Sequence, residues 1–228
     1  MPLNKRRHST ILVTYLLAEL VLLIAAKFCE HLSLNCEGAV KYAAVVCNAA
    51  FAFYYFLKYG RGRAGIHENL IAYGIFLTVI ADFFLTLISR ESFYVPGIVA
   101  FCAVQLLYML YLKPNRNLIV LMTVLYAASL LAIYKAGLLE TASALGALDL
   151  VLILGNTISA WFSNKSNPSL LFKLGITLFL GCDMSIFLSL ALSGGPGRAF
   201  AWMVWVFYAP SQVFITLSYM RAVLDCSE

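Results

Sequence analysis

Two aspartates stand inside long apolar stretches of this sequence. Asp82 lies in LIAYGIFLTVIADFFLTLIS at 70–89, and Asp183 lies in LLFKLGITLFLGCDMSIFLSLAL at 170–192. Each stretch is long enough to cross a bilayer. An ionised carboxylate inside such a span costs several kcal/mol, so an acidic residue there is a functional hypothesis by default. The alternative is that both are structural acids bonded to neighbouring helices.

The chemistry expected of this pair depends on the depth of the two carboxyl groups in the membrane. Both spans run in the same direction, and both aspartates fall about 4 to 5 Å beyond the span centres at 1.5 Å per residue. If the carboxyls come within a few ångströms, both cannot be ionised cheaply, so one stays protonated and the other acts as its base. That arrangement suits general acid–base catalysis. It would equally serve a proton-coupled transporter.

The composition indicates a polytopic membrane protein. Hydrophobic residues make up 62% of the 228 residues and charged residues 12%, with a mean hydropathy of +0.87, far outside the range of soluble proteins. Because backbone in lipid must satisfy its hydrogen bonds internally, the spans should be helices. We predict an all-α membrane protein with eight transmembrane helices in one compact domain, 1–228. The spans are expected at 11–27, 39–57, 69–88, 93–112, 118–134, 138–162, 169–192 and 200–220.

The distribution of Lys and Arg predicts the orientation of the bundle. Lys5, Arg6 and Arg7 precede the first apolar run, but Glu19 interrupts it and no small-residue cleavage site follows, so we interpret it as a span and not a signal peptide. With eight spans, eleven basic residues fall on the side of the termini and five on the other. This bias places both termini in the cytoplasm and the multi-pass chain in the cell membrane. The net charge of +5 therefore reflects topology and not nucleic-acid binding.

Further polar side chains lie within the predicted spans: Glu19, Lys41, Asn48, Gln105, Asp149, Asn156, Tyr208 and Gln212. Glu19 is either a functional acid or a carboxyl that bonds a neighbouring helix. Lys41 opens the second span and is either an interfacial lysine or a ligand for a headgroup. Pro210 is the one proline in a span interior, where it should kink the last helix and free a carbonyl near Gln212.

Other catalytic chemistries have little support in the sequence. There is no GxSxG elbow. His8, His31 and His67 all fall near loops, so neither a Ser-His triad nor a histidine metal site is expected in the membrane, and no cofactor or metal is predicted. The GRGRAG loop at 60–65 matches the GxGxxG pattern without its strand–turn–helix context. We interpret it as a basic turn near anionic headgroups.

The six cysteines show no metal-type spacing. Cys29 and Cys36 fall in one connection on the side away from the termini, and they are the only two expected to share an oxidising compartment. Two alternatives remain for them, a disulfide or two free thiols.

The halves 11–112 and 118–222 resemble each other in the placement of polar residues. Superposing them pairs four sets of residues: Asp82 with Asp183, Gln105 with Gln212, Asn48 with Asn156, and Lys41 with Asp149. A four-plus-four arrangement of parallel repeats would explain these pairs. The alternative is chance, because apolar segments align easily.

Several short motifs follow one another along the chain. ADFFL, PGIVAF and QLLYMLYL lie within 81–112, GCDMSIFLSLAL follows at 181–192, and Tyr208 and Gln212 form a Tyr-x-x-x-Gln pattern. Together they resemble the bacterial YhhN proteins and their animal relatives, the lysoplasmalogenases, whose second helix opens with a lysine that corresponds to Lys41. The resemblance covers nearly the whole chain in order and spacing. The sequence departs from the family pattern at Tyr42, Ala81, Gln105 and Cys182. These departures bear on the identity of the substrate more than on the fold.

The resemblance implies hydrolysis of the vinyl-ether bond of a lysoplasmalogen, an alkenyl lysophospholipid, to a fatty aldehyde and a glycerophospho-base. Protonation of the β-carbon would give an oxocarbenium ion, which water captures as a hemiacetal. Asp82 and Asp183 would supply the acid and the base, in an order that the sequence leaves open. Residues expected to contact the substrate or its water are Lys41, at the phosphate, with Asn48, Gln105, Asn156, Tyr208 and Gln212.

The expected partners are therefore the ether-lipid substrate and the surrounding membrane lipids. A function of another class remains open, a proton-coupled transporter or lipid flippase. Such a protein would use the same two aspartates, with Glu19 and Asp149, as a proton relay.

Overall fold

The computed structural model of this chain describes residues 2–32, 34, 36–60, 65–88, 91–162, 168–192 and 194–226, excepting the side chains of 2–7 and 91–92. These residues contain no strand, and eight of their helices are long and apolar enough to span a membrane. The prediction of an all-α fold with eight such helices is confirmed. Most of the predicted basic turn, 61–64, lies outside the described residues.

The helices in chain order are α1 (Pro2–His31), α2 (Glu37–Tyr55), α3 (Ile66–Asp82), α4 (Glu91–Leu112), α5 (Arg116–Lys135), α6 (Thr141–Phe162), α7 (Leu170–Ala191) and α8 (Gly194–Asp225). Two π-helical segments, η1 (Phe56–Gly60) and η2 (Phe83–Ile88), continue α2 and α3. Several helices are longer than the predicted spans; α8, for example, exceeds the expected 200–220 at both ends. The reason is that helical hydrogen bonding continues into the polar interface after the apolar run has ended.

Local signals fix several helix ends. The side chain of Asn115 accepts a hydrogen bond from the backbone N–H of Leu118 at 2.8 Å, which caps the start of α5. Ser169 caps α7 in the same way. Gly194 has a φ of 74°, a conformation that favours glycine, where the chain turns into α8. These side chains and backbone angles set where the connections turn.

Prolines lie inside two helices and not one. Pro210 is inside α8, as predicted, and Pro96 is inside α4. The prediction that Pro210 is the one proline in a span interior was wrong, because α4 begins at Glu91, five residues before Pro96. Both prolines remove a backbone donor within a helix.

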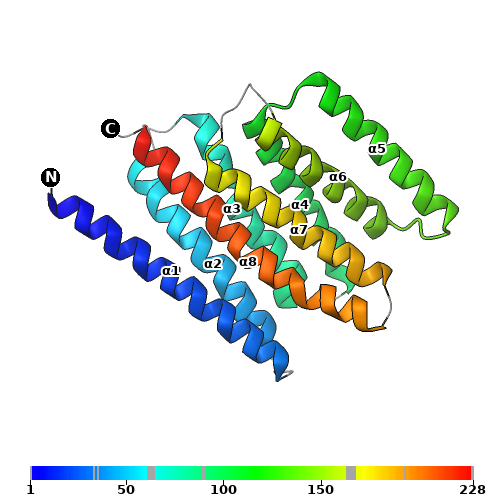
Figure 1. Cartoon of the computed structure of the whole chain (residues 1–228), viewed down its shortest axis with the longest axis horizontal. Coiled ribbons are helices and arrows are strands. Elements are labelled where there is room, and N and C mark those ends of the chain that lie inside the picture. Colours follow the sequence, from blue (N-terminus) through cyan, green and yellow to red (C-terminus); the bar gives the residue numbers. More distant parts are fainter. Residues whose placement is uncertain are drawn as a thin grey trace.

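The helices form one bundle with α1 along one edge and α5 along the opposite edge (Figure 1). Both chain ends lie at the same end of the bundle, here called the terminal end, and the opposite end is called the distal end (Figure 1). The most extensive packing joins α7 to α8, followed by α3 with α4 and α4 with α6. α5 packs closely against α6 alone among the described helices.

Close helix packing uses glycine, as is common where membrane helices meet. A Cβ on Gly175 of α7 would lie 2.7 Å from Cγ1 of Ile215 and 3.1 Å from the carbonyl oxygen of Ser211, both in α8. A Cβ on Gly74 of α3 would overlap the ring of Tyr108 in α4. The two pairs of helices therefore approach each other at positions where no larger residue fits.

The bundle exposes many large apolar side chains and buries a set of polar ones among the apolar residues of its core. α1 exposes a stripe of Val13, Leu17, Val21, Ile24 and Phe28 at helical spacing, which is the surface expected against lipid. Its one acid in this region, Glu19, is 5% exposed. α3, α4, α6 and α8 likewise bury polar side chains in the interior of the bundle. These side chains make up much of the candidate site.

Candidate functional site

Asp82 is held in the interior by two hydroxyl groups. It is the last α-helical residue of α3 and is 3% exposed. Tyr208 of α8 donates a hydrogen bond to its Oδ2, and Thr86 of η2 donates to its Oδ1 at 3.1 Å. The π-helical turn that follows Asp82 is a geometry that occurs frequently at functional sites. The carboxyl is thus fixed in one orientation by groups from two helical segments.

Tyr208 is itself fixed by aromatic packing. Its ring centroid lies 5.1 Å from that of Trp205, 5.6 Å from Phe179 and 6.3 Å from Phe101. All three pairs are edge-to-face, a favourable arrangement for aromatic rings. This packing directs the phenol hydroxyl at Asp82. The predicted site residue Tyr208 is therefore a direct partner of the predicted catalytic residue Asp82.

Asp183 of α7 lies beside Asp149 of α6. These helices are antiparallel, and the hydroxyl of Thr157 in α6 donates to the carbonyl of Ile176 in α7 at 3.4 Å. Asp149 is eight residues before Thr157 and Asp183 is seven after Ile176, so both lie about 10 to 12 Å from that contact in the same direction. The two carboxyls interact electrostatically.

Each of these two carboxyls has a free oxygen. Oδ1 of Asp149 and Oδ2 of Asp183 are buried and have no hydrogen-bond partner among the described residues. Two carboxyls in a medium of low dielectric cannot both carry charge at low cost. The pair is therefore suited to hold a proton that one of its members can give away.

Cys182 connects this pair with Asp82. Its thiol is buried and interacts electrostatically with Asp82, Asp149 and Asp183. Among the described residues, Asp82 and Asp183 form no hydrogen bond with each other; the partners of Asp82 are the hydroxyls, and Asp183 interacts with Asp149. The thiol of Cys182 is thus within electrostatic range of three carboxyls, and Asp183 interacts with Asp149, a pairing that sequence analysis did not anticipate.

Two predicted amides pair with each other in this interior. The side-chain N–H₂ of Asn156 in α6 donates to the backbone carbonyl of Gln105 in α4 at 2.9 Å and to its Oε1 at 3.1 Å. Both residues are fully buried. Nε2 of Gln105, Oδ1 of Asn156 and Nε2 of Gln212 in α8 have no partner among the described residues. The site therefore offers two donors and one acceptor that a water or substrate can use.

Asn48 belongs to a different polar group. Its Oδ1 accepts from the hydroxyl of Tyr15 at 2.6 Å, and its Nδ2 donates to Oε1 of Glu19 at 2.9 Å. These contacts join α1 to α2, which is the helix-bonding role considered for Glu19. Asn48, predicted to contact the substrate, thus lies beside Glu19. Its second partner, Tyr15, was not singled out by sequence analysis.

Lys41 lies at the distal end of α2, in a group of charges. Its ammonium contacts Glu37 and lies 3.6 Å from Oε2 of Glu30. It also lies 5.4 Å from the centroid of Trp205, the same ring that packs on Tyr208. A continuous path of contacts therefore runs from Lys41 through Trp205 and Tyr208 to Asp82.

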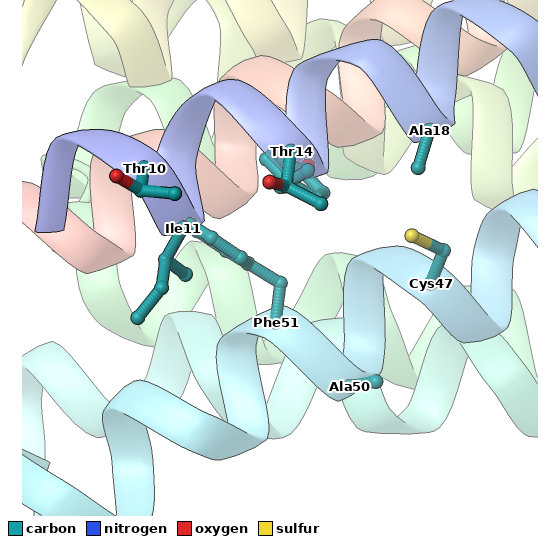
Figure 2. A pocket seen from close by; sticks show the side chains of 8 residues that line it. Thr10, Ile11, Thr14, Ala18, Cys47, Ala50 and Phe51 are labelled. Atoms are coloured by element: carbon teal, nitrogen blue, oxygen red, sulfur yellow. The ribbon is translucent and has the colours of Figure 1, made fainter. Parts of the chain in front are cut away.

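A cavity of about 350 Å³ opens between α1 and α2 (Figure 2). Its lining is mostly apolar and comprises Thr10, Ile11, Thr14, Tyr15, Ala18, Cys47, Ala50 and Phe51. A second cavity of about 280 Å³ lies between α5 and α6. Neither of these two cavities is lined by Asp82 or Asp183.

The two cysteines of the distal connection are free thiols. The sulfur atoms of Cys29 and Cys36 lie 3.4 Å apart and form a hydrogen bond, without a disulfide. Of the two alternatives that the sequence left, the structure has the unbridged one.

Several residues of the site were not singled out by sequence analysis. Thr86 follows Asp82 by one helical turn, a spacing that predicts a contact between them once the helix is assumed. Asp149 was recognised as an acid in a span but not as the neighbour of Asp183. That relationship depends on how α6 is rotated against α7, which hydropathy does not determine.

These features define the chain as a multi-pass helical protein with a group of carboxyls in its interior. The YhhN family model matches residues 37–219, from the first turn of α2 to the last turns of α8. The chain belongs to the YhhN family, as its motifs indicated. No curated protein and no solved structure matches it.

Proposed function

We propose that this protein is an integral membrane hydrolase of the cell membrane that cleaves the vinyl-ether bond of a lysoplasmalogen. The observation that carries the proposal is the buried carboxyl of Asp82, anchored by Tyr208, in the same bundle interior as the interacting carboxyls of Asp149 and Asp183. Membership of the YhhN family adds to it. The reaction needs an acid, a base and one water, and no cofactor.

Asp183 is the proposed acid. Because it shares the interior with Asp149, one member of that pair keeps a proton, and Oδ2 of Asp183 is free of other hydrogen bonds. The alkene electrons of the vinyl ether take this proton to form a C–H bond at the β-carbon. The positive charge then resides on the α-carbon and the ether oxygen as an oxocarbenium ion.

Asp82 is the proposed base. Held by the hydroxyls of Tyr208 and Thr86, its carboxylate stabilises the cation electrostatically and accepts a proton from the water that attacks the α-carbon. The free amide groups of Gln105, Asn156 and Gln212 can orient that water. The product of this step is a hemiacetal.

The hemiacetal collapses by the reverse use of the same groups. Asp82 returns a proton to the glycerol oxygen as the C–O bond breaks, and the hemiacetal hydroxyl loses its proton to the Asp149–Asp183 pair. The net change is the addition of one water, which releases the fatty aldehyde and the glycerophospho-base. Both carboxyl groups end in their starting protonation states.

A proton-coupled transporter or lipid flippase is the second candidate. The observation that favours it is that buried carboxyls occur on four helices, α1, α3, α6 and α7, as a relay would require. The two candidates differ in what they need. A hydrolase works in detergent, whereas coupled transport needs a sealed membrane and a gradient.

The test is release of free aldehyde from an alkenyl lysophospholipid by purified protein in detergent. We expect release by the wild type, a loss of at least 100-fold in Asp82→Asn and Asp183→Asn, and a smaller loss in Asp149→Asn, because Asp183 keeps its own carboxyl there. Each variant is first checked for a wild-type thermal transition.

The matched control is Glu19→Gln. It also replaces a buried carboxyl by an amide, but it keeps the oxygen that accepts from Asn48 and lies outside the proposed site, so its aldehyde release should equal that of the wild type. No release by folded wild-type protein across several ether lipids would reject the hydrolase. Substrate movement in sealed vesicles that depends on a pH gradient would then support the transporter.

A further inference from the structure

The distal end of the bundle holds two lysines that converge on one oxygen atom. Oε2 of Glu30 in α1 lies 2.9 Å from Nζ of Lys27 and 3.6 Å from Nζ of Lys41 in α2. Both lysine side chains are mostly buried, at 17% and 12% exposed, whereas Glu30 is 25% exposed. Sequence analysis singled out Lys41 alone, as the lysine that opens the second span.

Two tryptophans of α8 complete this group. The ammonium of Lys27 donates to the backbone carbonyl of Trp202 at 2.5 Å and lies 4.5 Å from the centroid of its ring. Nζ of Lys41 lies 5.4 Å from the centroid of the Trp205 ring. Such cation–π contacts favour a positive charge, and tryptophan is typical of the headgroup level of a membrane. The two ammonium groups are thus held in place by α8 and not only by their carboxylate partners.

We infer that Lys27 and Lys41 form a binding site for the phosphate group of a lipid, and that Glu30 occupies this site as an internal counter-ion when no ligand is bound. A single carboxylate oxygen serves Lys27 well, but at 3.6 Å it is beyond hydrogen-bond distance of Lys41, whose closer carboxylate partner is Glu37 of its own helix. A phosphate has several charged oxygens and can bond both lysines together. Glu30, as the more exposed partner, can turn to solvent when phosphate takes its place.

This inference deepens the proposed function, because it specifies how the headgroup end of the substrate is held. The contacts of Lys41 with Trp205, and of Trp205 with Tyr208, connect the phosphate site to Asp82. A lipid whose phosphate lies between the lysines would extend its glycerol and ether groups along α8 toward the carboxyls.

A purely structural role for these charges makes a different prediction. If Glu30 only stabilises α1 through Lys27 and fastens α1 to α2 through Lys41, Glu30→Gln removes these attractions and gains nothing. If Glu30 competes with phosphate, Glu30→Gln removes the competitor and strengthens binding. The direction of this one change therefore separates the two roles.

The experiment measures binding by tryptophan fluorescence in detergent, using an alkyl-ether lysophospholipid that has no double bond and so cannot be hydrolysed by this route. We expect the wild type to bind it at least 10-fold more tightly than the alkylglycerol with the same chain and no phosphate. Lys27→Gln and Lys41→Gln should reduce this preference to less than threefold. Glu30→Gln should tighten phospholipid binding severalfold and leave alkylglycerol binding unchanged.

Two controls guard against misfolding and against a general effect of charge. Lys27→Arg keeps a cation and should retain the preference. Lys135→Gln removes an exposed lysine at the distal end of α5 and should have no effect. Glycerophosphocholine and inorganic phosphate, which have no acyl or alkyl chain, identify the source of the phosphate. Strong binding of either one would indicate a soluble phosphate ligand and would overturn the inference that the ligand is a lipid.

Equal binding of the two ether lipids by wild type, or weaker phospholipid binding in Glu30→Gln, would overturn the inference. Because the probe is not hydrolysed, this result is independent of the proposed reaction. A phosphate preference in a protein that releases no aldehyde would retain the site and reject the hydrolase.

Discussion

At the scale of single residues, the two matching aspartates have different surroundings. Asp82 accepts a hydrogen bond from Tyr208, whereas Oδ2 of Asp183 has none. When Gln105 is placed on Gln212, the counterpart of Tyr208 four residues earlier is Phe101, which has no hydroxyl group. These surroundings suit the two aspartates to different roles: Asp82, which is held in place, to the role of base, and Asp183, which has a free oxygen, to the role of proton donor.

Removal of the Tyr208 hydroxyl should weaken the base without removing it. In Tyr208→Phe, Oδ2 of Asp82 loses its partner, and a hydrogen bond to a charged group contributes about 1.5 to 3 kcal/mol. We expect aldehyde release to fall by about 10- to 100-fold at that energy.

The matched control for this change is Tyr108→Phe, because the Tyr108 hydroxyl is equally buried but has no partner among the described residues. Its aldehyde release and its thermal stability should match or exceed those of the wild type. Equal losses in both variants would show that the hydroxyl of Tyr208 has no special role.

The sequence was informative about which residues matter and less so about their contacts. Asp82, Tyr208, Gln105 and Asn156 all lie buried in one interior, as residues too polar for lipid must. Their partners depend on how each helix is rotated about its axis, and a continuous apolar sequence leaves that rotation undetermined. Asn48 was consequently predicted at the substrate, whereas its contacts are with Glu19 and Tyr15.

At the scale of elements, the α3–α4 pair positions Asp82 through a close approach at Gly74. A Cβ there would overlap the fully buried ring of Tyr108 in α4. The helices must separate or the ring must move to admit it, and such overpacking costs about 1 to 3 kcal/mol. The number and order of the spans follow from hydropathy, but this contact does not, because it depends on the depth at which two helices cross.

We therefore expect Gly74→Ala to lower the thermal stability of the protein in detergent, measured as the midpoint of unfolding. The matched change Gly146→Ala in α6 introduces the same methyl group where no atom lies within 4 Å. It should be neutral or stabilise by about 0.5 to 1 kcal/mol, because alanine favours a helix over glycine. A stable Gly74→Ala variant would show that α4 can yield at this position.

At the scale of the whole molecule, helix packing follows a pattern that repeats when the halves are exchanged. α1 packs on α2 as α5 does on α6, α3 on α4 as α7 on α8, and α4 on α6 as α8 on α2. The packing of α3 on α8 has a counterpart of aromatic rings between α4 and α7, where Phe172 lies 5.0 Å from Tyr111 and Phe179 lies 5.8 Å from Phe101, centroid to centroid. The repeat of 11–112 and 118–222 stays a prediction.

The predicted orientation has a direct test in two exposed cysteines. Cys36 lies at the distal end and Cys226 at the terminal end, and both are exposed. If both termini are cytoplasmic, a membrane-impermeant maleimide applied to intact cells should label Cys36 and not Cys226. Permeabilised cells should show labelling of both, and serine variants of each cysteine assign the signal. Labelling of Cys226 alone in intact cells would invert the topology.

Helix α8 contributes to both ends of the proposed substrate path, with Trp202 and Trp205 at the lysines and Tyr208 at Asp82. Trp205 and Tyr208 are three residues apart, about 4.5 Å along the axis. The spacing of these residues along one helix therefore sets the distance between the headgroup and the scissile bond. A lipid with more or fewer atoms between its phosphate and its alkene would place its phosphate at the same lysines and present the wrong carbon to the acid. Selectivity would therefore follow molecular length and not headgroup identity.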